Sequence, residues 1–201
     1  MARPSKFNRQ EAIEFAMNEI WRDGYSPNSV KALSEKMGIT RSSFYNAFCS
    51  RESLFNEVLA LYLSRSPDVA FLDTHSCPSI KSLVSKTFRN ICKTRAEDVE
   101  GRGCLLINSV TSELYRSNDL IKTMLDEVFK GRTEAMQRLL KQAVAQNEID
   151  QKTDLYVLGL SLQNLLVGIN VMSKVVSQED DLWQIARATL IGLNMHEEIE
   201  L

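Results

Sequence analysis

The sequence contains little of what metal centres and common enzyme sites are built from. Of its 201 residues four are cysteine and two are histidine, and no two cysteines have the CxxC spacing. Structural zinc sites need four Cys or His ligands at close spacing, so we expect no metal and no cofactor. A Gly-rich phosphate loop, a GxSxG motif and an HExxH motif are also missing, and an enzyme is therefore not predicted.

Long apolar runs are missing as well. The most apolar stretch, Leu155 to Val176, is interrupted by polar residues, and the first eleven residues, MARPSKFNRQE, lack the apolar centre of a signal peptide. We therefore expect no membrane span, a cytoplasmic location and reduced thiols. Glycine (eight) and proline (four) are scarce, as in a mostly helical chain.

What is present indicates a soluble globular protein with one basic part. Hydrophobic residues make up 44% and charged residues 25%, which are ordinary values. Residues 1–65 carry nine Lys or Arg against seven Asp or Glu, and the remainder carries fifteen against nineteen. The first nine residues include Arg3, Lys6 and Arg9, a pattern as typical of a disordered tail as of an arm that follows DNA.

The most informative segment is SVKALSEKMGITRSSFYNAFCSRESL, residues 29–54. Its pattern predicts a helix over 29–37, a turn at Gly38 and a second helix over 40–48 that Thr40 caps. Phe44 and Phe48 fall on the inner face of the second helix, and its other face carries small donors, one Arg and one Asn. Such a helix suits the major groove of DNA, where Arg41 can pair with guanine and Asn46 with adenine.

The rest of the chain predicts helices and no strand. Before the motif, a helix over about 8–22 is capped by Asn8, and after it Ser50 caps a helix that ends near Arg65. Beyond a loop over 65–78, the expected helices cover about 79–97, 104–115, 118–146, 153–174 and 178–193. We therefore predict an all-α chain with an N-terminal three-helix helix-turn-helix DNA-binding domain (1–50) joined to a larger helical ligand-binding and dimerisation domain (51–201).

The last two helices, about Thr153 to Leu193, predict a subunit interface. The first of them is apolar on more than one side, so it must be buried on more than one side. Its second partner is either the chain's own core or another subunit. A two-fold homodimer would also match two half-sites on double-stranded DNA.

The segment from Gly24 to Leu54 resembles the DNA-binding domain of TetR-family transcriptional regulators, and the Gly-Cys-Leu-Leu run that begins at Gly103 resembles one subgroup of that family. The positions that carry the likeness are Gly24-Tyr25, Ser29-Val30, Leu33-Ser34, Gly38-Ile39-Thr40, Phe44-Tyr45, Phe48 and Arg51-Glu52-Ser53-Leu54. Two residues depart from the family pattern, because position 42 is often glycine and position 34 often alanine.

The resemblance implies a role for each matching residue. Tyr45, Arg51, Ser29 and Lys31 would contact phosphates, and the base-reading side chains would come from the second helix of the motif. The complete DNA-binding set is Ser29, Lys31, Thr40, Arg41, Ser42, Ser43, Tyr45, Asn46 and Arg51. Judged alone, Tyr45 could instead support the helix as a half-buried aromatic, and Arg51 could be a solvated charge.

The resemblance also implies a ligand cavity between the middle helices and a dimer through the last two. Candidate lining residues are Phe88, Cys92, Cys104, Ile107, Tyr115, Met124, Phe129, Tyr156 and Asn164, although most of these residue types at helical spacing belong to cores. Asn164, among leucines, needs a partner in a ligand, a carbonyl or a second subunit. Cys104 follows Gly103 at an expected helix start near Arg102, so it is either a reactive thiol or a small packed side chain.

These observations predict a ligand-responsive DNA-binding regulator, a repressor that a small molecule or a thiol-reactive signal releases from a palindromic operator. The effector itself is unknown. The alternative is a helical DNA-bound protein whose C-terminal body recruits a protein partner and binds no small molecule.

Overall fold

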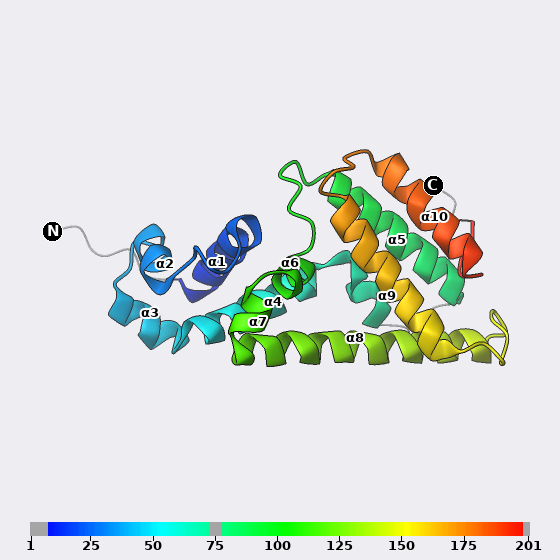
Figure 1. The fold of residues 1–201 in the computed structure, drawn as a ribbon, viewed down its shortest axis with the longest axis horizontal. Helices are drawn as coiled ribbons and strands as arrows, with labels where there is room; N and C mark the ends of the chain where they lie inside the picture. Colours follow the sequence, from blue (N-terminus) through cyan, green and yellow to red (C-terminus); the bar gives the residue numbers. More distant parts are fainter. Residues whose placement is uncertain (1–7, 73–77, 199–201) are drawn as a thin grey trace. The chain divides into compact units, whose positions relative to one another are not determined.

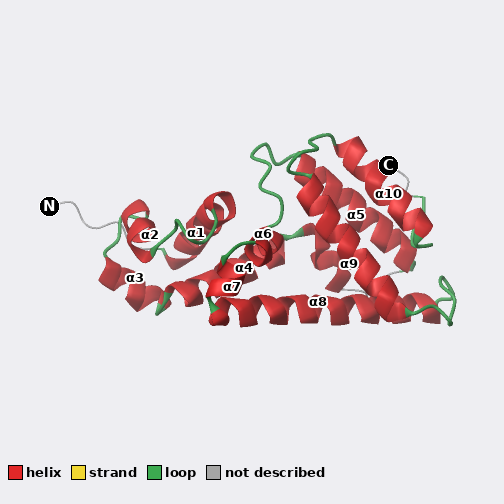
Figure 2. Cartoon of the chain, in the orientation of Figure 1, coloured by secondary structure: helices red, strands yellow, loops and turns green. Residues whose placement is uncertain are grey.

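The computed structural model describes residues 8–72 and 78–198, and within these ranges it contains helices and no strand (Figure 2), which confirms the predicted all-α class. Arg3, Lys6, His75 and Cys77 lie outside the described residues. The elements are α1 (Arg9–Asp23), α2 (Val30–Lys36), α3 (Arg41–Phe48), α4 (Arg51–Arg65), the 3-10 helix η1 (Pro67–Leu72), α5 (Ile80–Ala96), α6 (Leu105–Thr111), α7 (Leu114–Ser117), α8 (Asp119–Ala145), α9 (Leu155–Met172) and α10 (Glu179–Gly192).

The described residues form two compact units. The first comprises residues 8–65 and 108–125, and the second comprises 66–72, 78–107 and 126–198. Helix α4 packs against α1 and α3, which places it in the first unit, whereas the boundary expected from the sequence follows residue 50. Helix α8 begins in the first unit and ends in the second.

The predicted helix starts agree with the structure because capping is a local property. The side chain of Asn8 accepts hydrogen bonds from the backbone N–H groups of residues 10 and 11, Ser29 from residue 32, Thr40 from residue 43 and Ser50 from residue 53. Each cap satisfies a backbone N–H group that has no partner within its helix. Thr40 and Ser29 thereby fix both helices of the predicted motif.

Two segments differ from their prediction. The expected loop over 65–78 contains η1, which buries Phe71 in the core of the second unit. The expected single helix over 104–115 divides into α6 and α7. At the break the hydroxyl of Ser112 donates to the carbonyl of Ser109 at 2.7 Å, and a side-chain bond of this kind competes with helical backbone bonding.

The core of the first unit is aromatic. The inner face of α3 buries Phe44 and Phe48 completely, with their ring centroids 5.3 Å apart. Tyr25, in the turn after α1, packs edge-on against Phe55 of α4 at 5.2 Å. These contacts hold α3 by its apolar side, so its opposite side faces solvent.

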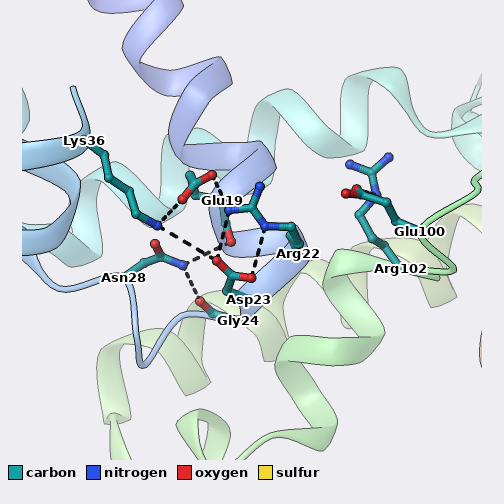
Figure 3. Close-up of polar contacts among 8 residues, drawn as sticks. All are labelled: Glu19, Arg22, Asp23, Gly24, Asn28, Lys36, Glu100 and Arg102. Carbon is teal, nitrogen blue, oxygen red and sulfur yellow. Dashed lines mark hydrogen bonds and ion pairs between the residues drawn. The ribbon is translucent and has the colours of Figure 1, made fainter.

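A polar cluster joins the end of α1 to α2 (Figure 3). The Glu19 carboxylate is buried and accepts from Arg22 at 2.5 Å and from Lys36 of α2. Asn28, also buried, donates to the carbonyls of Glu19 (3.1 Å) and Gly24 (2.8 Å). The cluster therefore sets where α2 begins relative to α1.

We expect Glu19→Gln to destabilise the protein at neutral pH and to reduce its acid sensitivity. The hydrogen bond from Lys36 holds the pKa of Glu19 below its ordinary value of 4.5, against the opposing effect of burial. The stabilisation is present above the unfolded value and is lost as pH falls through the lower folded value. Urea denaturation should show a loss of about 1–3 kcal/mol in the free energy of unfolding near pH 7.

The same difference should shrink as the pH falls below 4.5. Glu35→Gln is the control, because Glu35 is exposed and its contact with Lys31 is 3.9 Å long. This variant should change the free energy of unfolding little at either pH. A Glu19→Gln effect that is the same at acid and neutral pH would contradict the assignment.

The second unit packs α5, α9 and α10 side by side, with residues 126–145 of α8 (Figure 1). Val84, Phe88 and Ile91 of α5 are fully or almost fully buried in this core, and so are Leu139 and Leu140 of α8. Their helical spacing places them on the inward face of each helix.

Candidate nucleic-acid interface and effector cavity

The outer face of α3 carries the side chains expected to meet DNA. Arg41, Ser42 and Asn46 are exposed, and Tyr45 is 50% exposed with its ring edge-on to Phe44 at 5.8 Å. Ser43 is half-buried and lies 2.9 Å from the hydroxyl of Thr40, which also caps the helix. The motif therefore presents an Arg, an Asn and three hydroxyl-bearing side chains on one helix whose inner face is anchored by Phe44 and Phe48.

The start of α2 presents two further candidates. Ser29 is half-buried and its hydroxyl accepts from the backbone N–H of Ala32 at 3.2 Å. Lys31 is exposed, and its 3.9 Å contact with Glu35 joins two side chains that are both about two-thirds exposed. Exposed ion pairs contribute little to stability. The Lys31 ammonium can therefore exchange this contact for one with a phosphate.

Arg51 lies apart from these exposed side chains. Its guanidinium stacks 3.6 Å above the Tyr25 ring, and its Nη2 donates to the carbonyl of Tyr25 and, at 3.4 Å, to that of Ser26. The structure thus places Arg51 under the turn that precedes α2, where it holds this turn against the start of α4.

Tyr25 completes this junction. Its hydroxyl donates to Glu52 at 3.2 Å, and Asn118 donates to the same carboxylate oxygen at 3.3 Å. Burial raises the pKa of Tyr25 to about 12, so the phenol keeps its proton and its donor role at physiological pH. Sequence patterns could not reveal this network, because its hydrogen bonds join residues up to 66 positions apart.

Arg9, expected to be part of a tail or an arm, belongs to the folded first unit. Its guanidinium donates to the carbonyl of Ala47 at 3.2 Å and pairs with Glu57 at 2.6 Å. It also lies 5.2 Å from the centre of the Phe48 ring. Arg9 therefore holds the end of α3 against α4.

A narrow pocket that is partly open to solvent lies within the second unit. Its wall is mostly apolar and comes from η1, α5, α6, α8 and α9, with Cys104 just before α6. The lining residues are Ser66, Asp68, Phe71, Leu72, Ile91, Arg95, Cys104, Leu106, Ile107, Phe129, Arg132, Ala135, Met136, Gln163, Leu166, Val167 and Asn170. A mostly apolar wall with a few fixed polar groups is typical of small-molecule sites.

Only part of the predicted lining set lies at this cavity. Cys104, Ile107 and Phe129 line it. Phe88 and Cys92 are buried in the core beside it, and burial raises the pKa of the Cys92 thiol to about 12. Tyr115 and Met124 belong to the first unit, and Tyr156 and Asn164 are exposed on α9.

The polar residues that do line the cavity were missed. Asp68 pairs with Arg132 and also accepts from the Ser66 hydroxyl, and Arg95 donates to the buried amide of Asn170 at 2.6 Å. Asn170 lies on α9, as does Asn164, but the side chain of Asn170 is buried whereas Asn164 is exposed. Asp68, Arg95 and Arg132 belong to no motif of the sequence, and two of their contacts join residues more than 60 positions apart.

Cys104 is buried in the cavity wall, directly after Gly103 and one residue before α6. The guanidinium of Arg102 contacts Asp98 at 3.0 Å and Glu100 at 3.2 Å. Figure 3 draws Arg102 beside Glu100. The expected position of Cys104 before a helix is confirmed, and the nearby guanidinium is held by two carboxylates.

Gly103→Ala should destabilise the second unit by about 2–3 kcal/mol. Gly103 has φ +67, and a β-carbon there would lie 2.8 Å from the carbonyl oxygen of Asn170 and 2.9 Å from Cε of Lys174. Gly38→Ala is the matched control, because Gly38 also has φ +67 but open space around it. Thermal denaturation should show the larger loss for Gly103→Ala; equal losses would mean that the close approach is unimportant.

Several apolar side chains of α9 and α10 are exposed to solvent. The exposed residues are Tyr156, Val157, Leu160, Val171, Met172, Ile185 and Ile191. Among the described helices, α9 alone is long and apolar enough to cross a membrane, a property that core helices of soluble proteins share. Large exposed apolar patches are typical of interaction surfaces.

Comparisons with known proteins agree with this geometry. Two family models match: "Bacterial regulatory proteins, tetR family" over residues 12–58 and "Tetracyclin repressor-like, C-terminal domain" over residues 83–189. The Escherichia coli K12 protein named HTH-type transcriptional repressor ComR is 28% identical over 195 residues, which cover 94% of this chain and 90% of that protein. The repressor DhaR of Mycobacterium sp. strain GP1 is 26% identical over 134 residues, 66% of this chain and 65% of that protein.

A solved structure is similar over almost the whole chain. It is a cysteine mutant of the TetR family transcriptional regulator CifR in complex with 26 bp double-strand operator DNA. The two chains are 26% identical, 94% of this chain and 98% of that chain are covered, and the TM-score is 0.82.

Proposed function

This chain belongs to the TetR family of bacterial regulatory proteins, and we propose that it is a repressor that binds a palindromic operator as a homodimer and leaves it when a small molecule occupies its cavity. DNA binding rests on the family and on the exposed polar face of α3. The names of the related repressors support repression over activation. Regulators of this family are soluble DNA-binding proteins, and we place this one in the cytoplasm.

The observation that carries the proposal is the division of α3 into two faces. Phe44 and Phe48 anchor it from within, while Arg41 and Asn46 are exposed with the side-chain chemistry that reads guanine and adenine. Ser42, Ser43 and Thr40 supply short donors at the same helix. Tyr45, Lys31 and Ser29 would contact phosphates and fix the register of the helix in the groove.

The apolar face of α9 and α10 is the proposed subunit interface. Its exposed residues would cost solvation free energy in a monomer, and a second copy of the same face would bury them. Asn164, exposed on α9, would then meet polar groups of the partner. Leu160→Glu should weaken both dimerisation and operator binding, whereas Asn90→Glu, which adds the same charge at an exposed position of α5, should leave both unaltered.

The cavity is the proposed effector site, with Cys104 as a thiol that a reactive signal can reach. Alkylation of the reduced protein, with the modified residue located by mass spectrometry, tests the thiol. Absence of labelling at Cys104 while exposed Cys49 reacts would rule out a sensor role for it.

One experiment tests the core of the proposal. The purified chain is used to select bound sequences from a random DNA pool, and its mass in solution is measured by light scattering. We expect an inverted repeat with half-sites about one helical turn apart and a dimeric mass. A monomer that selects a single half-site, or no selection at all, would contradict the proposal. A metabolite panel that neither stabilises the protein nor releases the operator would favour a body that recruits a protein partner.

A further inference from the structure

A carboxylate of the first unit joins three segments that are far apart in the sequence. Glu52 lies in the first turn of α4, and its Oε1 atom accepts hydrogen bonds from the Tyr25 hydroxyl at 3.2 Å and from the Asn118 amide at 3.3 Å. Tyr25 belongs to the turn between α1 and α2, and Asn118 lies between α7 and α8. One oxygen atom therefore ties the start of α8 to the turn that leads into the helix-turn-helix.

Glu52 is charged at neutral pH, which strengthens both bonds. Burial would raise the pKa of this carboxyl, but hydrogen bonds from its own backbone N–H and from the side chains of Tyr25 and Asn118 hold it below its ordinary value of 4.5. Hydrogen bonds to an ionised acceptor are stronger than those between neutral groups. Tyr25 is buried and the other two side chains are half-buried, so the junction is partly shielded from water.

Asn118 uses both ends of its amide. Its Oδ1 atom accepts from the backbone N–H of Ile121 at 3.1 Å and thereby caps α8, while its Nδ2 atom donates to Glu52. Asp would cap the helix equally well, but a carboxylate has no hydrogen to donate to a second carboxylate. The bond to Glu52 is therefore a role of Asn118 that is separable from capping.

Tyr25 transmits this constraint to the start of α2. Its carbonyl accepts from the backbone N–H of Asn28 at 3.1 Å and from Arg51, whose guanidinium lies 3.6 Å from the centre of the Tyr25 ring. Ser29 follows directly and caps α2. The position of Tyr25 therefore determines where α2 begins, and with it the positions of Ser29 and Lys31, the proposed phosphate contacts.

We propose, building on the operator binding inferred above, that Asn118 and Glu52 are positioning residues for DNA binding. Neither contacts DNA in this scheme. Their hydrogen bond holds Tyr25, and through it the start of α2, in the arrangement that binds phosphates. Without the bond the turn becomes more mobile, and the loss of this freedom on the operator lowers the affinity.

Asn118→Asp separates the two roles of Asn118. The new carboxylate still caps α8, but the donor is lost and a second negative charge faces Glu52. We expect affinity for the operator selected by the unmodified protein to fall at least about fivefold. The slope of log affinity against log salt should stay the same, because no phosphate contact is removed. Fluorescence anisotropy with the labelled operator duplex measures both quantities.

The double variant Asn118→Asp/Glu52→Gln exchanges the amide and the carboxylate between the two positions. The amide at position 52 can then donate to the carboxylate at position 118, and its oxygen can still accept from Tyr25. Operator affinity should return to within about twofold of that of the unmodified protein. Asn18→Asp is the matched control, because it adds the same charge at an exposed position of α1; it should leave affinity unaltered.

Amide hydrogen exchange over residues 25–32 tests the positioning without DNA. These amides should exchange faster in Asn118→Asp than in the unmodified protein and in Asn18→Asp, and the double variant should restore slow exchange. Unaltered exchange in a folded Asn118→Asp variant, faster exchange with unaltered operator affinity, a lowered salt slope, or a double variant no better than the single one would each overturn the inference.

The proposed function and this inference fail in different proteins. An unmodified chain that selects no operator would contradict the proposed function, whereas each outcome that overturns the inference is seen in the variants. Hydrogen exchange needs no operator, so it decides whether Asn118 and Glu52 hold the start of α2 in either case.

Discussion

Replacing Asp68 with Asn is expected to lower the free energy of unfolding by about 3–5 kcal/mol. The side chains of Asp68 and Arg132 are 7% and 17% exposed, and they pair across the wall of the cavity. Asn keeps the shape of Asp but removes the charge, so the Arg132 guanidinium would lose the carboxylate that it contacts. Urea denaturation followed by circular dichroism measures the loss.

Two further variants make this prediction specific. Asp180→Asn removes an acid whose side chain is 86% exposed and lies 3.3 Å from Arg89, and it should cost less than about 1 kcal/mol. Asp68→Leu combined with Arg132→Met replaces the pair by apolar groups and should recover much of the loss. A cost below about 1 kcal/mol for Asp68→Asn would show that water reaches the pair freely.

The first unit was largely predictable from its sequence because its determinants are local. Asn8, Ser29, Thr40 and Ser50 each cap a helix through an N–H group two or three residues away. The inward positions of α3 follow from a spacing of three to four residues. Such signals lie within one turn of helix and need no knowledge of the fold.

The cavity was not predictable in the same way. On α9, apolar residues occur on several sides, so the sequence could not distinguish the buried amide of Asn170 from the exposed one of Asn164. The partners of the buried charges are far away in the chain: 64 positions separate Asp68 from Arg132, and 75 separate Arg95 from Asn170. Pairings over such distances are decided by packing, which a periodicity does not encode.

The same distinction applies to Arg51. At the start of a helix it has the position and charge of a phosphate contact, and the sequence supported that role. The structure shows its guanidinium engaged by the Tyr25 ring and carbonyl, two features that a one-dimensional pattern cannot bring together. We therefore expect Arg51 to act on DNA binding through the position of the turn before α2.

The double variant Arg41→Ala/Asn46→Ala should lose most of the operator's sequence preference. Each side chain, paired with a base edge, discriminates by about 1–3 kcal/mol, and contacts at separate base pairs add approximately. The combined loss of about 2–6 kcal/mol corresponds to roughly 30-fold or more in the ratio of operator to random-DNA affinity. Both side chains are exposed, so stability should change by less than about 0.5 kcal/mol.

In the same titrations, two single variants distinguish a residue that contacts phosphate directly from one that positions the turn before α2. Lys31→Ala should weaken binding to all sequences equally and reduce the slope of log affinity against log salt by about one unit. Arg51→Ala should also weaken binding to all sequences but leave the slope unaltered, because its charge is already engaged by Tyr25. A lowered slope for Arg51→Ala would instead make it a direct phosphate contact. Full operator preference in the Arg41→Ala/Asn46→Ala variant would mean that α3 does not read the bases.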